Sequence, residues 1–569
     1  MNKNKIYKTI INNREYTEWS IIDNETNTII DDSNILSTIN PIKNKLFSQD
    51  TVIINENREC IIYNSEIRNK IIIPGVLILE KNKTYGKLGR RNLYKCLPND
   101  KNLPSFLIPY EIKMGFSKDF KNKYVTFQFV SWGDVKHPFG QLTTVIGNVE
   151  GVFHYFEYQL YCKNLNLSLS NFNKQLKQKM NEIKDQQIIT IIEEKYHIED
   201  HLNKDIFSID SKTTTDYDDA ISIEKNGDTT HVYVYISNVF FYLEVLKLWN
   251  LITNRVSTVY LPDRKRTMLP VCLSDSLCSL KQHNIRIATT FEFIYSNQYE
   301  LIDVKYYNSK INVNKNYVYN EDSLLNSLNY QQLFELTKTK TDFLENSNDL
   351  VAYWMINVNK TVSEKLLENR CGIYRSVSII NKDKPIDSKL SIEASRAIRT
   401  WNNVVGTYVY FSDDADLKHD MLDIKSYVHI TSPIRRLVDI LNQIELMDIL
   451  KIQISDECKK FHKSCIDKLD KINTDMRSVR KIQYECDLLY KCHFTPDILD
   501  KTYDGILFNK EVKDDGSYNY MVYLEELNML YKYNHVNNHE NCEKQKFSLF
   551  IFEKESNFKK KIKLQIKAK

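Results

Sequence analysis

The sequence has 569 residues, of which 42% are hydrophobic and 27% charged, and its net charge is +4. This composition is typical of soluble globular protein. A chain of this length is too long to fold around one hydrophobic core, so about three or four domains are expected. Gly and Pro number only 13 and 11, which excludes collagen-like and long disordered segments.

No targeting or membrane segment is evident. The start, Met1 to Lys5, is not followed by an apolar core, and the most apolar run, 71–79, is too short to span a bilayer. The 11 cysteines include no C-x-x-C pair, which favours reduced thiols over disulfides or a metal finger. We therefore expect a monomer in the cytoplasm or nucleus that does not engage a membrane.

The first 165 residues have the pattern of short strands. Apolar or β-branched runs separated by polar turns occur at 51–54, 71–79, 124–130 and 142–146. Many short strands at such spacing favour small barrels over one large sheet. A charged stretch at 169–195 with apolar residues at helical spacing is expected to link this part to the next.

The pattern becomes mixed after about residue 200. Strands are expected at 206–209, 220–223 and 231–239, and helices at 330–346, 348–368 and 438–452. Short strands return at 503–508, 518–523 and 547–552, in a span the size of one small barrel. The expected fold class is therefore α+β multidomain, with barrels at both ends and a mixed α/β centre.

Four aspartates between two of these strands form the strongest chemical signal. They are Asp210, Asp216, Asp218 and Asp219. Like charges packed this closely raise one another's pKa and are tolerated mainly when a cation neutralises them. Carboxylate oxygens select hard ions, so the segment predicts a magnesium or manganese site.

The segment admits two other interpretations. An acidic surface loop is the commonest fate of such a stretch, but apolar strands bracket this one, so it should lie close to a core. An EF-hand needs Gly at position six and Glu at position twelve. Counting from Asp216 gives Ile221 and Gly227, which excludes that site.

A second cluster lies in 427–439. Pro433 suits the first turn of a helix and Ser432 is a plausible N-cap, which would put Arg435 and Arg436 near the helix start. An arginine there can hold a phosphate in two-point contact. On spacing alone, a helix start with a structural ion pair is the better explanation of the segment.

Three motifs together resemble the RNase II/RNase R (RNB) family, and in particular its eukaryotic exosome-nuclease branch. I-D-x(5)-D-x-D-D-A is matched by residues 209–220, and H-x-T-S-P-I-R-R by residues 429–436. The third comprises T-V-Y-L-P-D-R at 258–264, M-L-P at 268–270 and L-S-D-S-L-C-S-L at 273–280, and it runs into Arg286 and Ala288. Their order along the chain is that of the family.

The resemblance implies a domain organisation. Residues 1–70 would be a divergent cold-shock-like OB barrel, 71–165 a second one, 166–199 a helical linker, 200–496 the catalytic domain and 497–569 a divergent RNA-binding OB barrel. The second barrel match includes F-L-I-P at 106–109 and S-W-G-D-V-K-H-P-F-G at 131–140. The endonuclease domain of some exosome nucleases is expected to be missing.

The resemblance also implies an activity and its residues. The family hydrolyses single-stranded RNA processively from the 3′ end to nucleoside 5′-monophosphates. The four aspartates would hold magnesium, possibly manganese, as a pair of ions, with Asp218 and Asp216 among the catalytic residues. Arg435 would act in catalysis and bind RNA with Arg436 and Ser432, while Tyr260 would stack on a base.

Several positions depart from the family pattern. Tyr235 and Asn238 replace His and Asp, Gln443 replaces the His of an H-R pair, and Lys360 stands where Glu is frequent. None is an expected metal ligand, but they put substrate preference in doubt. A catalytically inactive RNA-binding protein on the same fold, and a subunit of an RNA-decay complex, are the competing hypotheses.

Overall fold

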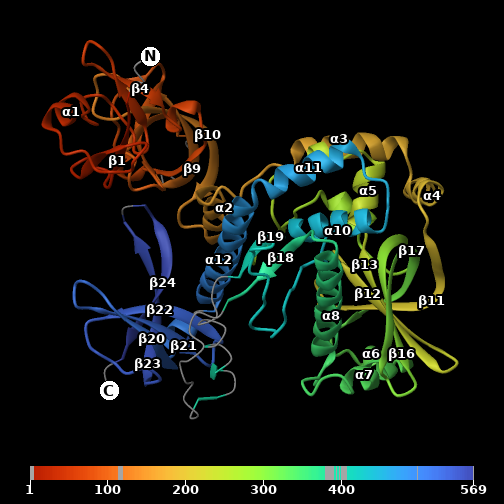
Figure 1. Ribbon diagram of the computed structural model, residues 1–569. Helices are drawn as coiled ribbons and strands as arrows, with labels where there is room; N and C mark the ends of the chain where they lie inside the picture. The colour runs from red at the N-terminus through yellow and green to blue at the C-terminus, as the bar shows by residue number, and fades with distance from the viewer. Residues whose placement is uncertain are drawn as a thin grey trace. The chain divides into compact units, whose positions relative to one another are not determined.

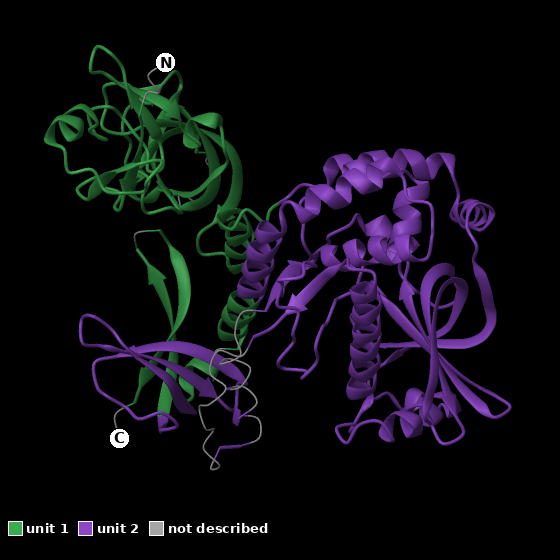
Figure 2. Cartoon of the chain, in the orientation of Figure 1, with its two compact units in different colours: residues 1–166, 484–502, 546–569 green, residues 167–483, 503–545 purple. Residues whose placement is uncertain are grey.

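The computed structural model describes residues 5–112, 120–378, 390–391, 394–395, 398, 406–495, 497–555 and 557–567. The chain forms two compact units (Figure 2). Unit 1 comprises residues 1–166, 484–502 and 546–569, and unit 2 comprises residues 167–483 and 503–545. Each unit draws on several of the predicted domains, whose boundaries stay a prediction.

Unit 1 begins with a four-stranded antiparallel sheet in the order β2-β1-β3-β4. Its elements are β1 (Ile6–Ile11), β2 (Trp19–Asp23), α1 (Ser33–Thr38), β3 (Thr51–Ile54) and β4 (Cys60–Asn64). Alternate residues of β1 are buried, as expected of a sheet with one face on a core. Tyr7, Ile21 and Val52 form that core together with Ile39 and Leu46.

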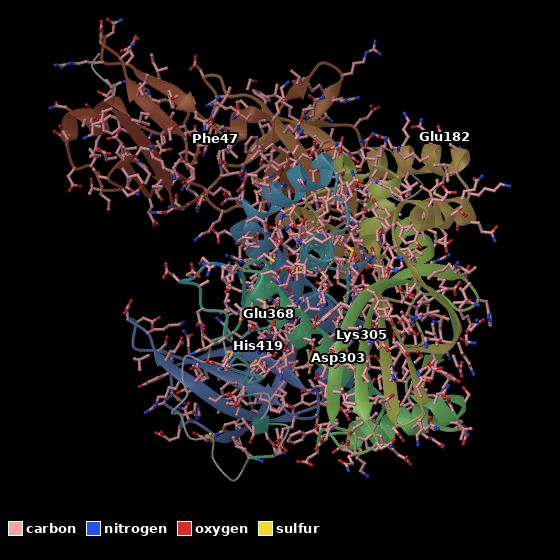
Figure 3. The ribbon with its side chains drawn as sticks, turned by 45° about the vertical axis from the view of Figure 1, so that its right-hand side comes forward. Phe47, Glu182, Asp303, Lys305, Glu368 and His419 are labelled. Carbon is pink, nitrogen blue, oxygen red and sulfur yellow. The ribbon has the colours of Figure 1, made fainter. Side chains whose placement is uncertain are left out.

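A closed ring of strands follows in the same unit. The strands are β5 (Ile73–Leu77), β6 (Lys87–Leu88), β7 (Arg91–Pro98), β8 (Phe106–Tyr110), β9 (Lys123–Ser131) and β10 (Phe139–Asn148). The pairings run β5-β9-β10-β8-β7 and return to β5, so five strands close into a barrel of the expected OB type. Phe47, labelled in Figure 3, joins the core of this barrel and stacks on Phe106.

Helix α2 (Val152–Cys162) follows this barrel, and its Tyr158 stacks on Tyr124 of β9. The later parts of unit 1 include the end of α12 (Leu469–Phe494), α13 (Asp497–Asp500) and the antiparallel pair β23 (Lys544–Lys554) and β24 (Lys559–Ile566).

A second closed barrel dominates unit 2, in the order β11-β12-β13-β16-β17. Its strands are β11 (Glu199–Asp210), β12 (Asp219–Asn226), β13 (Thr229–Ser237), β16 (Ile285–Ser296) and β17 (Leu301–Val318). Ile206, Ala220, Tyr233 and Tyr235 belong to its buried core. The exposed Asp303 and Lys305 lie on β17 (Figure 3).

Helices make up much of the rest of unit 2 (Figure 1). They are α3 (Ser170–Glu182), α4 (Asp185–Lys195), α5 (Val239–Val245), α6 (Asp322–Leu325), α7 (Leu328–Lys338), α8 (Ser347–Glu368), α10 (Leu437–Ile449), α11 (Asp456–Ile466) and the first part of α12. Helix α8 packs on the barrel through Trp354, whose ring lies 5.4 Å from that of Phe293 on β16. No helix of the described ranges is both long and apolar enough to serve as a membrane span.

Two short ribbons and three further strands complete unit 2. The ribbons are β14 (Val259–Tyr260) with β15 (Lys265–Arg266), and β18 (Ile373–Ser376) with β19 (Thr407–Tyr410). A π-helical turn occupies Leu273–Leu277. Strands β20 (Tyr503–Val512), β21 (Tyr518–Leu524) and β22 (Met529–His535) pair antiparallel.

The predicted fold class, α+β with several β-barrels, is confirmed. Every strand and helix expected from the patterns is present, although the helix expected over 330–346 ends at Lys338. The long strands β16 and β17 and the long helix α12 were not expected. Because β16 is buried along almost its whole length, it lacks the alternation that marks a half-exposed strand.

Candidate active site

The acidic residues gather at one end of the central barrel. Asp210 is the last residue of β11 and Asp219 the first of β12. These strands run antiparallel with Phe207 opposite Ile221, so the end of one and the start of the other meet at the same end of the barrel. The loop between them carries the remaining two aspartates.

Asp218 is held by the segment that precedes helix α10. Its Oδ1 accepts a hydrogen bond from the backbone N–H of Ile434 at 2.9 Å, and its Oδ2 accepts one from Nε of Arg435 at 3.0 Å. Burial raises the pKa of the Asp218 carboxyl to about 7, although both donors oppose the rise. Only 4% of this side chain is exposed, so no water replaces these partners.

Among the described residues, the carboxylates of Asp210 and Asp219 have fewer protein donors than that of Asp218. Burial raises the pKa of Asp210 to about 6 against the opposing effects of Ser208 and Arg435. Burial also raises the pKa of Asp219 well above its ordinary range, and the charges of Asp210 and Asp218 add to it. Oδ2 of Asp210 is buried without a hydrogen-bond partner in the part of the chain that the structure describes.

Asp216 is engaged at both oxygens. The hydroxyl of Tyr260 donates to Oδ2 at 3.0 Å, and Nζ of Lys265 lies 2.9 Å from Oδ1. Lys265 also pairs with Asp275 at 2.9 Å. The Tyr260 side chain nevertheless stays accessible, with the residue 42% exposed, so its ring can meet a base.

Within the described residues, no group of three or more His, Cys, Asp or Glu side chains is arranged to hold a metal ion. Asp216 and Asp218 are already paired with protein donors, which leaves Asp210 and Asp219. Two close carboxylates with raised pKa, one with an unpartnered buried oxygen, are a donor set that suits a hard divalent cation. The chemistry of this pair therefore fits magnesium or manganese.

Arg435 lies in a turn and not in a helix. Helix α10 begins at Leu437 with Arg436 at its N-cap position, so the prediction of a helix start at Ser432 and Pro433 was wrong. The physical reason is long-range: Arg436 forms an antiparallel bridge to Ser257 and the Leu437 N–H donates to the Val256 carbonyl, which holds Arg436 extended directly before the helix. A local pattern does not reveal such a partner.

The guanidinium of Arg435 has fixed and free sides. Its Nε binds Asp218, and its Nη2 donates to Oγ of Ser432 at 2.8 Å. Burial lowers its pKa, but the facing carboxylates outweigh that effect and the net shift is upward, so it stays charged. Because 43% of the side chain is exposed, the remaining edge can meet a phosphate.

Arg436 has a different environment. Its Nη2 donates to the buried Asp439 at 2.8 Å, and Asp439 also accepts the backbone N–H of Ser432 at 2.7 Å. Only 19% of the Arg436 side chain is exposed. Its contact with RNA stays a prediction, while the alternative of a structural ion pair describes what is observed.

The positions that depart from the family pattern are accommodated internally. Tyr235 is fully buried in the barrel, and Asn238 caps helix α5 with its side chain. Gln443 accepts from the N–H of Phe240 at 3.1 Å and donates to a backbone carbonyl at the end of β13. Lys360 lies exposed on helix α8.

Sequence reasoning missed the partners of the aspartates. Lys265, Asp275, Thr215 and the backbone of Ile434 were not singled out. Asp275 lies inside the motif at 273–280, and Lys265 lies five residues after Tyr260. The available signal was therefore that charged side chains lie in or next to motifs of otherwise apolar and small residues.

Comparison with known proteins agrees with these motifs. A family model described as the RNB domain matches residues 198–333 and 323–452. Ribonuclease R of Aquifex aeolicus is 34% identical over 117 residues, which is 20% of this chain and 17% of that protein. Ribonuclease R of Mycoplasmopsis pulmonis is 31% identical over 144 residues, 23% of this chain and 20% of that one. The matched stretches thus span a fifth or less of these relatives.

Solved structures extend the likeness to the whole fold. Mycoplasma genitalium RNase R in complex with ribose methylated single-stranded RNA covers 98% of this chain and is itself covered over 100%, with a TM-score of 0.67 at 16% identity. Yeast Ssd1, described as a pseudonuclease, covers 96% of this chain and is covered over 80%, with a TM-score of 0.53 at 14% identity. At such identities the likeness concerns the fold alone. Residues 198–452, which include the acidic end of the central barrel, therefore carry an RNB domain, and the chain resembles the RNase II/RNase R (RNB) family that its motifs predict.

Proposed function

We propose that this protein is a 3′-to-5′ exoribonuclease that hydrolyses single-stranded RNA to nucleoside 5′-monophosphates with the help of a divalent cation. The observation that carries the proposal is the set of buried carboxylates with raised pKa at the end of the barrel, next to a half-exposed arginine. Such a set is stable as anions only beside positive charge.

Each residue then has a role. Asp210 and Asp219 would hold the cation, which when bound would lower the pKa of a water and stabilise charge on a phosphate oxygen. Arg435 offers its free edge to the scissile phosphate or its neighbour, and Asp218 with Ser432 keeps that edge in place. The Tyr260 ring offers a stacking surface for any base, which suits digestion without sequence preference.

Single-stranded RNA is the proposed substrate for two reasons. The Mycoplasma genitalium RNase R that shares this fold was solved with single-stranded RNA, and also with double-stranded RNA. Stacking on an exposed tyrosine also requires a base that is free of its own duplex. Processivity, the release of 5′-monophosphates and the monomeric state are part of the same proposal.

The second candidate is an RNA-binding protein without nuclease activity. Two of the four aspartates are neutralised by protein cations, and yeast Ssd1, which shares the fold, is described as a pseudonuclease. We favour the enzyme because Asp210 and Asp219 remain free for a cation.

The test uses single-stranded RNA labelled at its 5′ end, incubated with magnesium and either wild type or Asp219→Asn. Wild type should give a ladder that shortens from the 3′ end, and the variant should give none. RNA that is bound but uncut by both proteins would support the second candidate. Cleavage by the variant at the wild-type rate would refute the assignment of Asp219.

A further inference from the structure

Lys265 brings a fixed positive charge into the acidic cluster. Its Nζ lies 2.9 Å from Oδ1 of Asp216, 2.9 Å from Oδ2 of Asp275 and 2.5 Å from Oγ1 of Thr215. An ammonium group has three N–H donors, so these acceptors use all of them. With 24% of the side chain exposed, the ammonium is held in one position by the protein.

Asp216 has no free oxygen as a result. Lys265 engages Oδ1, and the Tyr260 hydroxyl donates to Oδ2 at 3.0 Å. Its side chain is only 5% exposed, so water cannot exchange for these partners easily. A cation that bound Asp216 would have to displace the ammonium, the hydroxyl or both.

The backbone places the two partners of Asp216 next to each other. Tyr260 and Lys265 are directly opposite each other in the β14–β15 ribbon, so the two side chains that hold Asp216 are cross-strand neighbours. Asp275 is fixed in turn by Oγ of Ser274 at 2.6 Å and by Oγ1 of Thr215 at 2.7 Å. The ammonium is therefore anchored from both sides.

We propose that the ammonium of Lys265 is the permanent counter-ion of Asp216 and takes the place of a second metal ion. The site then binds a single divalent cation, at Asp210 and Asp219. The inference rests on the proposed function and departs from the sequence-based expectation of a pair of ions. It makes Lys265 a positioning residue that holds Asp216 and, through it, the Tyr260 hydroxyl.

The positions of the charges support this assignment of the four carboxylates, two to protein cations and two to a metal ion. Asp216 and Asp275 share one lysine, and Asp218 has Arg435, so each of these carboxylates faces a protein cation. In the described part of the chain, Asp210 and Asp219 have no such direct ion pair. A lysine is a compact point charge and can occupy the position of an ion, whereas it cannot lower the pKa of a water as a metal does.

The experiment counts bound ions without relying on catalysis. The full chain is freed of metal with EDTA and titrated with Mn²⁺, and free Mn²⁺ is followed by its EPR signal. Wild type is compared with Lys265→Met, with the charge-preserving control Lys265→Arg, and with Asp216→Asn and Asp210→Asn. Circular dichroism checks that each variant is folded.

Wild type and Lys265→Arg should bind a single Mn²⁺, and Lys265→Met should gain a second. Asp216→Asn should keep the wild-type affinity within error, while Asp210→Asn should weaken binding by more than about tenfold. Should Lys265→Met fail to fold, the comparison of the two aspartate variants decides by itself.

Two ions in wild type, a single ion in folded Lys265→Met, or equal losses in Asp216→Asn and Asp210→Asn would overturn the inference. RNA cleavage by a wild type that holds two ions would refute the inference and leave the exonuclease intact. A wild type with a single bound ion that cuts no RNA would refute the exonuclease and leave the division of the carboxylates standing.

Discussion

Asp218→Asn should make the metal-free protein more stable at alkaline pH while abolishing the proposed activity. Asp218 is almost completely buried, and its pKa rises from 3.8 to about 7 on folding. The unfolded chain therefore releases this proton first as the pH rises. Stability decreases as the pH rises from about 4 to 7, and the whole penalty is present above pH 7.

The size of the effect follows from that shift. Three pKa units correspond to about 4 kcal/mol at pH 8, as an upper bound. Asn keeps an oxygen for the Ile434 N–H but loses the hydrogen bond from Arg435, which costs about 1–2 kcal/mol. The net gain is about 2 kcal/mol at pH 8 and should disappear near pH 4, where Asp218 itself is protonated.

Urea unfolding in EDTA, at pH 8 and pH 4, measures the gain. Asp303→Asn is the matched control, because Asp303 lies exposed on β17 and should change the free energy of unfolding by less than about 0.5 kcal/mol. If Asp218→Asn destabilises the protein at pH 8, or if its effect on the free energy of unfolding is the same at both pH values, the buried charge of Asp218 does not destabilise the folded protein as argued.

Three further changes test other parts of the protein. Tyr260→Ala should raise KM for single-stranded RNA about tenfold in steady-state cleavage assays, because stacking of a base on the ring contributes about 1–3 kcal/mol. Tyr260→Phe keeps the ring and should keep the KM of wild type. Equal KM values for Tyr260→Ala and wild type would contradict the stacking role. Burial lowers the pKa of His201 to about 4 from 6.5, so the contribution of this residue to stability is complete above pH 6.5 and declines as the pH falls toward 4. In the same urea titrations, the free energy of unfolding of wild type should fall by about 1–2 kcal/mol relative to that of His201→Phe between pH 7 and 5, because the opposite pH dependence of Asp218 is common to both proteins. Gln443→Ala should lower the free energy of unfolding by about 2–4 kcal/mol because it leaves the Phe240 N–H unpaired. Lys360→Ala, at an exposed position, should change the free energy of unfolding by less than about 0.5 kcal/mol. Similar melting temperatures for the two variants would refute the difference expected between them.

The sequence predicts the acidic site well because its chemistry is local. Asp216, Asp218 and Asp219 lie within four residues, and apolar strands on either side place them near a core. The same reasoning fails at Ser432, which resembles an N-cap. Helix α10 starts only at Leu437, because the intervening backbone is held by residues about 180 positions earlier. Caps are decided by where the backbone goes, and here a distant segment decides it.

The partners of the aspartates were beyond local reasoning for a similar reason. Lys265 reaches Asp216 across 49 residues, and Ile434 reaches Asp218 across 216. Spacing along the chain shows that carboxylates are close to one another, but it does not show which of them already have a cation. The number of ions at the site depends on that second fact.

The closure of the central barrel also bears on motion. Each of its five strands has a neighbour on both sides, so none has a free edge from which fraying can begin. Asp219 pairs with Ile236 across β12 and β13, and Asp210 with Val318 across β11 and β17. Because Asp210 lies in the parallel β11–β17 ladder, its backbone amide should exchange with deuterium slowly, when the barrel opens. The turn that carries Arg435 is tied to the chain by a bridge between Arg436 and Ser257 and by the Thr258 N–H, which donates to the Arg435 carbonyl, so the arginine is held in register with the carboxylates as well.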